Sequence, residues 1–146
     1  MSPIPLSAAR VLAVDDDDAN LRFLRRLLQR AGCTQVETTA DPTQAAAIAL
    51  AFAPHLVLLD LNMPVMDGFQ VLRTLRAMDG HAPRVVVLSG EDPESASSRV
   101  LVEGAQAFVS KPYDAAGLLA LLEEVLNDPR HAPRHSPPGA GSGSRG

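Results

Sequence analysis

The stretch VLAVDDDDAN, residues 11–20, joins four apolar residues directly to four consecutive aspartates. The apolar part is too short for a stable helix and is rich in valine, which favours a buried strand. Neighbouring carboxylates repel one another, so the aspartates need a charge partner or an exposed position. The next ten residues, LRFLRRLLQR, place leucines at helical spacing. We therefore predict a strand, an acidic loop and a helix, and we expect Asp17 or Asp18 to cap that helix.

The alternation of short apolar runs with helical patterns continues along the chain. The predicted strands are residues 11–14, 35–38, 56–59, 85–88 and 107–110. The predicted helices are residues 21–31, 42–52, 69–75, 93–102 and 115–125, the last one capped by Asp114. Five consecutive strand–helix units with buried strands predict an α/β fold, in which helices cover both faces of a parallel sheet.

The bulk properties of the chain limit its domain count and its class. A length of 146 residues fits one domain, and the net charge of −4 indicates neither a nucleic-acid footprint nor a membrane-surface patch. We find no signal peptide and no apolar run near the ~20 residues that span a bilayer. Because Cys33 is the only cysteine, we expect a reducing compartment and a cytoplasmic protein. We predict an N-terminal extension (1–9), one domain (10–127) and a disordered Pro/Gly/Ser/Arg-rich tail or linker (128–146).

Polar side chains follow four of the five predicted strands. Because the carboxyl ends of parallel strands share one edge of the sheet, we expect the residues after them to lie close together. These residues are Asp15 and Asp16 after the first strand, Asp60 after the third, Ser89 after the fourth and Lys111 after the fifth. The predicted site therefore combines three acids, a hydroxyl and a cation.

This set of side chains suits a divalent ion together with a phosphoryl group. Oxygen ligands without His or Cys fit a hard cation, Mg²⁺ or in its place Mn²⁺. A carboxylate can act as nucleophile, and phosphoryl transfer depends mainly on positioning and charge neutralisation. Lys111 would neutralise one phosphoryl oxygen, and the Ser89 hydroxyl would donate a hydrogen bond to another.

The motifs at these strand ends resemble those of a known protein family. The run DLNMPVMDG, residues 60–68, is similar to the phosphoacceptor signature of response-regulator receiver domains, which act in two-component signalling. The other motifs of the family are matched, in order, by Asp15-Asp16, Ser89-Gly90 and Lys111-Pro112. The resemblance covers residues 10–126 and is of the chemotaxis-regulator type. It implies a flavodoxin-like three-layer fold with strand order 2-1-3-4-5.

The resemblance also implies a role for each residue of the site. Asp60 is phosphorylated, and Mg²⁺ is held by Asp16, Asp60 and the backbone carbonyl of Asn62, with Asp15 acting mainly through a metal-bound water. Lys111 pairs first with the carboxylate and then with the phosphoryl group. The peptide bond expected to be cis is Lys111–Pro112.

The resemblance further implies two kinds of position: those that couple phosphorylation to a conformational change, and those that set the lifetime of the phosphoryl group. Ser89 moves toward the phosphoryl group, and Phe108, three residues before the lysine, turns inward as an aromatic switch. The positions that tune the lifetime are Asn62 and Glu91. Both are polar and can orient an attacking water, so we expect a short-lived phosphoryl group.

The implied partners are a sensor histidine kinase or a phosphotransfer protein as donor. Phosphorylation would then shift the balance between existing conformations of the face built by the fourth helix, fifth strand and fifth helix. A downstream protein, an output domain or a second phosphorylated copy would bind it. We expect no direct nucleic-acid binding, no membrane association and no enzymatic activity beyond self-phosphotransfer and autodephosphorylation. A stand-alone receiver and a receiver from a larger regulator both remain open.

Three other functions compete with this hypothesis. A receiver-like module that is never phosphorylated would keep the fold for binding alone. An aspartate-nucleophile phosphatase of the haloacid-dehalogenase type would use Asp15 and Asp17, but the Thr or Val expected after this pair and a cap domain are missing. A calcium loop at DDDDAN lacks the central Gly and the terminal Glu of an EF-hand.

Overall fold

The computed structural model describes residues 4–60, 68–78, 82–90 and 104–128. Within these residues one sheet of five parallel strands has the order β2-β1-β3-β4-β5, which confirms the predicted fold class and topology. The strands are β1 (Arg10–Val14), β2 (Gln35–Thr39), β3 (Leu56–Asp60), β4 (Arg84–Ser89) and β5 (Ala107–Ser110). The helical elements are η1 (Leu6–Ala8), α1 (Asp18–Arg30), η2 (Pro42–Gln44), α2 (Ala45–Phe52), α3 (Gly68–Arg76) and α5 (Ala115–Leu126).

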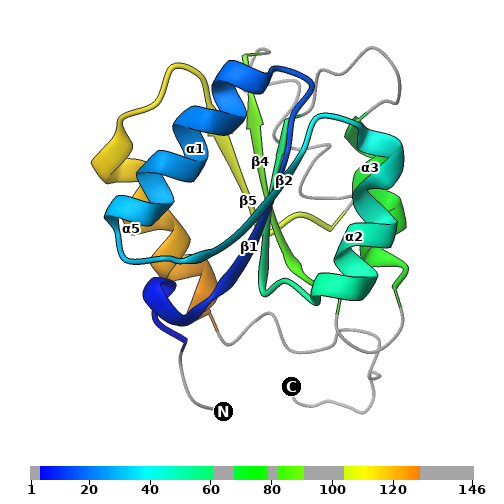
Figure 1. Ribbon diagram of the computed structural model, residues 1–146, viewed down its shortest axis with the longest axis horizontal. Helices are drawn as coiled ribbons and strands as arrows, with labels where there is room; N and C mark the ends of the chain where they lie inside the picture. Colours follow the sequence, from blue (N-terminus) through cyan, green and yellow to red (C-terminus); the bar gives the residue numbers. More distant parts are fainter. Residues whose placement is uncertain (1–3, 61–67, 79–81, 91–103, 129–146) are drawn as a thin grey trace.

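Helices cover both faces of the sheet, which gives three layers. Figure 1 shows α1 and α5 on one face and α2 and α3 on the other. Successive strand side chains point to opposite faces, so β1 contributes Val11 and Ala13 to one core cluster and Leu12 and Val14 to the other. Both faces of the central strands are therefore buried, which explains why these strands are continuous apolar runs.

The first helix has the acidic cap that the sequence predicts, but it begins three residues before and ends one residue before the predicted bounds of 21–31. Asp17 is the N-cap, and its side chain accepts a hydrogen bond of 3.0 Å from the backbone N–H of Ala19. Asp18 lies in the first turn, where a negative charge favours the helix N-terminus. Beyond the C-cap, Gly32 adopts a φ of +91°, a conformation that glycine tolerates best. The leucines that α1 buries are Leu21, Leu24 and Leu28.

The predicted second helix differs from the structure at its start. Residues 42–52 were expected to form one helix, whereas the structure has the short 3-10 turn η2 followed by α2. The Asp41 side chain accepts a hydrogen bond of 3.0 Å from the backbone N–H of Thr43, and a proline opens the turn. This local bond stabilises a tight turn in place of the first α-helical turn.

The third and fifth helices lie close to their predicted bounds. Asp114 caps α5, as predicted, and its carboxylate accepts a hydrogen bond of 2.8 Å from the backbone N–H of Gly117. The predicted fourth helix, residues 93–102, lies outside the described residues. None of the described helices combines the length and the apolar character that a bilayer crossing requires.

The N-terminal stretch contributes to the core at the amino edge of the sheet. Leu6 is 1% exposed and Ala9 is buried, both within the core cluster on the α1–α5 side. The thiol of Cys33, which is buried as well, donates a hydrogen bond of 3.4 Å to the carbonyl oxygen of Ala9. Residues 129–146 of the predicted tail lie outside the described residues, and the predicted domain boundaries remain a prediction.

Candidate functional site

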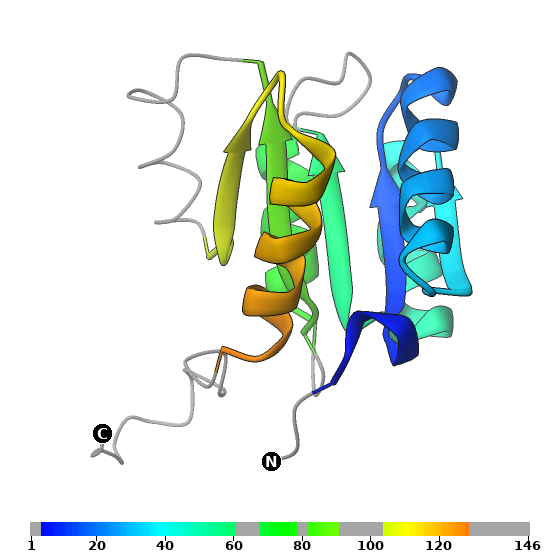
Figure 2. The ribbon, with the colours of Figure 1, turned by 90° about the vertical axis from the view of Figure 1, so that its left-hand side faces the viewer.

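The carboxyl ends of the strands meet at one edge of the sheet, where the arrowheads point in Figure 2. The register aligns Val14 with Leu59 and places Asp60 opposite Leu88. Neighbouring strands therefore end within about one residue of each other, at the Cα spacing of ~4.8 Å that separates paired strands. Side chains that are far apart in the sequence are brought together there.

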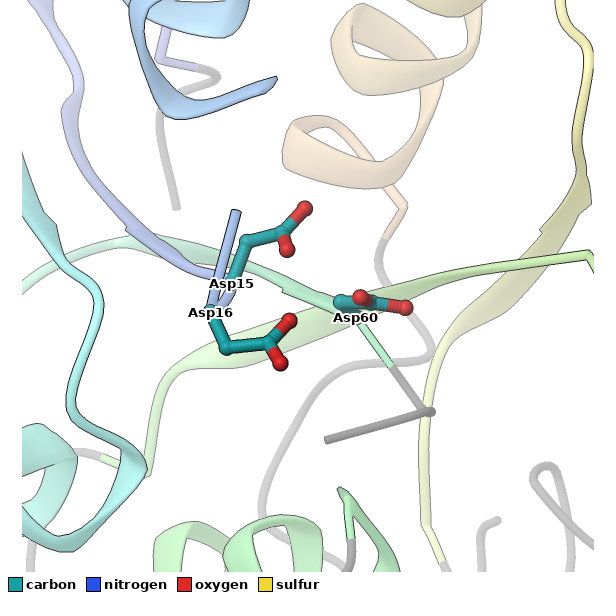
Figure 3. A group of neighbouring side chains, drawn as sticks. All are labelled: Asp15, Asp16 and Asp60. Carbon is teal, nitrogen blue, oxygen red and sulfur yellow. The ribbon is translucent and has the colours of Figure 1, made fainter. Parts of the chain in front are cut away.

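Three carboxylates form a cluster at this edge. One carboxylate oxygen from each of Asp15, Asp16 and Asp60 lies within 4.8 Å of the others (Figure 3). Asp15 is 2% exposed and Asp60 is 7% exposed, whereas Asp16 is exposed. Burying two carboxylates beside a third is costly unless cations or hydrogen-bond donors compensate the charge.

The carboxylate of Asp15 is held by two hydrogen bonds from the start of α1. One oxygen accepts a bond of 3.0 Å from the backbone N–H of Asp17, and the other accepts a bond from the side-chain amide of Asn20. Its own backbone N–H donates to the carbonyl oxygen of Thr39 at 3.2 Å. Asn20 was not predicted as part of the site. Its position in the first turn of α1, three residues after the capping aspartate, is the only indication that the sequence offers.

Lys111 supplies a positive charge to the cluster. Its Nζ lies 3.5 Å from Oδ1 of Asp60, and its backbone N–H donates a hydrogen bond of 2.8 Å to the carbonyl oxygen of Ser89. The peptide bond between Lys111 and Pro112 is cis. The lysine is therefore attached to the end of β4 by its backbone and to the end of β3 by its charge.

Two of the remaining predicted residues, Ser89 and Phe108, lie within the described part of the chain. Ser89 is fully buried at the end of β4 and pairs in register with Ser110 of β5. Phe108 is half-buried and packs against the core cluster on the α2–α3 side. Asn62 and Glu91 lie outside the described residues. The structure thus places the described residues of the predicted site at the carboxyl ends of β1, β3, β4 and β5.

The donor set fits a hard divalent cation. Among the described residues, three carboxylates lie beside one ammonium group, that of Lys111, and the ligand atoms that the cluster offers are oxygens. The negative charge also affects Tyr113 in the loop before α5. Burial, and in second place the charge of Asp15, raise the pKa of the Tyr113 phenol.

The fold and this site define an α/β protein whose acidic cluster lies at the switch-point edge of a parallel sheet. The family model described as response regulator receiver domain matches residues 11–123. The chain therefore belongs to the response-regulator receiver domain family.

Individual relatives agree with this assignment. The transcriptional regulatory protein PrrA of Mycobacterium leprae is 39% identical over 121 residues, which are 83% of this chain and 51% of PrrA. The chain thus spans about half the length of such curated relatives. The chemotaxis protein CheY4 of Vibrio cholerae is 34% identical, with a TM-score of 0.73 over 81% of this chain and 98% of that chain. CheY in a CheX–CheY–BeF3–Mg²⁺ complex from Borrelia burgdorferi is 29% identical, with a TM-score of 0.75 over 81% and 89%.

Membership of this family indicates what an acidic cluster of this kind binds and what the domain does. Receiver domains are the phosphoacceptor switches of two-component systems, and they bind Mg²⁺ at an acidic aspartate cluster. The structure contains an acidic aspartate group of this kind, made of Asp15, Asp16 and Asp60. The family therefore supports a signalling role for this chain.

Proposed function

We propose that Asp60 is the phosphoacceptor of this chain and receives a phosphoryl group from a histidine kinase, a phosphotransfer protein or a small phosphodonor. The observation that carries this proposal is the position of its carboxylate. It lies within 4.8 Å of the carboxylates of Asp15 and Asp16 and 3.5 Å from Nζ of Lys111. A carboxylate placed between a cation site and a fixed ammonium group is suited to attack a phosphorus atom whose oxygens need neutralising.

The residues at this edge fit Mg²⁺, or Mn²⁺ in its place. Asp16 and Asp60 would hold the ion with the backbone carbonyl of Asn62, and Asp15 would act mainly through a water. The ion supplies charge neutralisation to the phosphoryl oxygens when it is bound. The hydrogen bonds from Asp17 and Asn20 keep the carboxylate of Asp15 oriented for this purpose.

The transfer step itself requires little from the protein besides position and charge. A carboxylate oxygen of Asp60 forms a bond to phosphorus while the bond between phosphorus and the donor atom breaks, and the donor leaves with that electron pair. Lys111 pairs with the phosphoryl oxygens as their charge approaches, and the Ser89 hydroxyl donates a hydrogen bond to one of them. Removal of the phosphoryl group requires a water, which the side chains of Asn62 and Glu91 orient.

The proposed output is a shift between existing conformations. Ser89 moves toward the phosphoryl group, Phe108 turns inward, and the face that includes β5 and α5 changes its preferred state. A downstream protein, an output domain or a second copy of the chain binds this face. The relatives are compatible with an attached or a separate output, since the match covers 51% of PrrA, a transcriptional regulatory protein, and 98% of CheY4, a chemotaxis protein.

The direct test is labelling with acetyl phosphate, with and without Mg²⁺, read by intact mass and with Asp60→Ala as control. We expect a Mg²⁺-dependent adduct that is stable in acid, labile in base and absent from the variant. A folded wild-type protein that forms no adduct would support the fixed-module alternative. Steady turnover of an unrelated phosphate ester would support the phosphatase alternative.

The same labelled protein tests the predicted lifetime. After the donor is removed, the adduct should decay rapidly, because both tuning positions carry polar side chains. A half-life of many hours in Mg²⁺ buffer would contradict this prediction.

A further inference from the structure

An aromatic pair links two elements that border the acidic site. Tyr113, the only tyrosine in the chain, lies two residues after Lys111 in the loop before α5. Its ring centroid is 6.4 Å from that of Phe23 on α1, and the ring planes are inclined by 43°. This distance and tilt are those of attractive aromatic pairs. Figure 1 shows the same loop, in yellow, beside α1.

Phe23 is placed unusually for a residue that serves only the core. It is 45% exposed, and together with Leu50, at 77%, it is one of two exposed large hydrophobic side chains among the described residues. The leucines of α1 fill the core without it, since Leu21, Leu24 and Leu28 are buried. Phe23 therefore contributes a contact across the surface to Tyr113, while most of the packing of α1 comes from its neighbours.

The two rings belong to the two sides of the site. On the α1 side, Asn20 lies three residues before Phe23, and so on the same side of the helix, and its amide holds the carboxylate of Asp15. On the loop side, Lys111 lies two residues before Tyr113 and points its Nζ at Asp60. The ring contact thus joins the element that holds a metal-site acid to the loop that carries the cation.

We propose that Phe23 and Tyr113 are positioning residues, which together hold the Lys111 loop against α1 and so keep the Lys111 ammonium group over Asp60. This inference rests on the proposed function of Asp60. We name this ring contact the aromatic brace. The rings provide the contact, and the phenol hydroxyl is not needed for it.

The physical reason lies in the lysine side chain. Lysine carries its charge on a flexible four-carbon stem, so the position of Nζ depends on how well its backbone is fixed. The backbone of Lys111 is attached to β4 by one hydrogen bond, to the carbonyl oxygen of Ser89. A second attachment through Tyr113 restricts the loop from the side of α1. Rates of group transfer are sensitive to such positioning, because small displacements move the reacting atoms out of line.

The test compares initial rates of Asp60 labelling by acetyl phosphate at saturating Mg²⁺. We expect Phe23→Ala and Tyr113→Ala each to slow labelling about fivefold, well below the ~10²-fold that a 1 Å misplacement can cost. The double variant should be no slower than either single variant, because both remove the same contact. Tyr113→Phe should restore the wild-type rate.

A matched control separates positioning from a general loss of apolar surface. Leu50→Ala removes the other exposed hydrophobic side chain, on α2, which covers the opposite face of the sheet. It should leave the rate unchanged, and circular dichroism should show all variants folded at the assay temperature. If Leu50→Ala slows labelling as much as Phe23→Ala, or if Tyr113→Phe is as slow as Tyr113→Ala, the brace is excluded.

Repeating the Phe23→Ala comparison in a protein that already carries Lys111→Ala tests whether the aromatic brace acts through the lysine. In Lys111→Ala, followed over long incubations to obtain its residual rate, Phe23→Ala should cause no further slowing. A further fivefold loss would show that the rings act elsewhere and would overturn the proposal. Failure of the two proposals can be told apart, since absence of any wild-type adduct refutes the role of Asp60, whereas equal rates in wild type and Phe23→Ala refute only the brace.

Discussion

Polar groups differ between the amino edge of the sheet, where the parallel strands begin, and the carboxyl edge, where they end. At the amino edge, Nε of Arg10 donates to the carbonyl oxygens of Phe52 and Ala53 at 3.1 and 2.9 Å. Nδ1 of His55 accepts a hydrogen bond of 3.0 Å from the backbone N–H of Arg10. These bonds fasten α2 and β3 to β1. At the carboxyl edge three carboxylates lie together, and Lys111 is the ammonium group that the described residues place beside them.

This difference shows how one fold separates stability from function. The amino edge adds a buried leucine from η1 and hydrogen bonds between elements, all of which stabilise the folded chain. The carboxyl edge gathers three carboxylates, whose mutual repulsion favours binding of a cation and opposes folding. Parallel strands make this separation possible, because all their carboxyl ends lie on one side. Substitutions at the two edges should therefore affect different measurements.

The largest expected effect is that of Asp60→Asn at the carboxyl edge. Labelling by acetyl phosphate should be lost completely, because an amide cannot form the acyl phosphate. The free energy of unfolding without Mg²⁺ should stay equal or rise, since a charge is removed from the cluster. Intact mass and urea denaturation measure the two quantities. Glu37→Gln, an exposed acid on β2, is the control that should change neither.

The next effect belongs to the amino edge. Leu6→Ala should lower the free energy of unfolding by about 2–5 kcal/mol, because it leaves a cavity beneath α5. The labelling rate of the folded protein should not change. Leu50→Ala makes the same chemical change at an exposed position and should cost far less. A Leu6→Ala protein of wild-type stability would contradict the role given to η1.

A smaller effect is expected from Mg²⁺ on stability. Ligand that binds only the folded state at a hundred times its Kd stabilises it by about 2.7 kcal/mol. We expect Mg²⁺ to raise the unfolding midpoint of the wild type and to leave that of Asp16→Asn nearly unchanged. Denaturation at constant ionic strength, with Na⁺ as control, makes this comparison. Equal stabilisation of both proteins would place the ion somewhere other than the cluster.

The smallest effect concerns His55 at the amino edge. Burial, and then the charges of Arg10 and Arg84, lower the pKa of His55 below its usual value of 6.5. Its contribution to stability is therefore complete above pH 6.5 and is lost as the pH falls below that value, because the unfolded chain takes up the proton first. Protonation would also remove the Nδ1 acceptor that the Arg10 N–H uses.

The stability difference between wild type and His55→Gln measures this contribution while other titrating groups cancel. We expect the wild type to lose stability relative to the variant between pH 7.5 and 5.5. A difference that is constant over this range would contradict the prediction.

The strands were predictable from the sequence, whereas the start of the second helix was not. All five predicted strands agree with the structure to within one residue at either end. The central strands β1, β3 and β4 are buried on both faces and appear in the sequence as continuous apolar runs, whereas the edge strands β2 and β5 are less buried. The 3-10 turn before α2 depends on one bond between the Asp41 side chain and the backbone N–H of Thr43. Such a local hydrogen bond competes with the first turn of an α-helix, and the spacing of apolar residues in the sequence does not reveal it.

The site was predictable where its residues follow strands and unpredictable where they lie on a helix or loop. The residues of the site that lie at or just beyond the carboxyl end of a strand are Asp15, Asp16, Asp60, Ser89 and Lys111. Asn20 and Tyr113 reach the site only through the packing of α1 and of the loop before α5. Their contacts depend on tertiary structure, which the spacing of residues along the chain does not encode.

The most direct test of the account locates the phosphoryl group on the chain. Borohydride reduces an acyl phosphate to an alcohol and so converts a phosphorylated aspartate into homoserine. Wild-type protein labelled by acetyl phosphate in Mg²⁺ would be reduced, digested and mapped by mass spectrometry. We predict homoserine at position 60 and aspartate at positions 15 and 16. Homoserine at position 15 or 16, or at no position in a folded protein, would contradict the assignment of Asp60 as the phosphoacceptor.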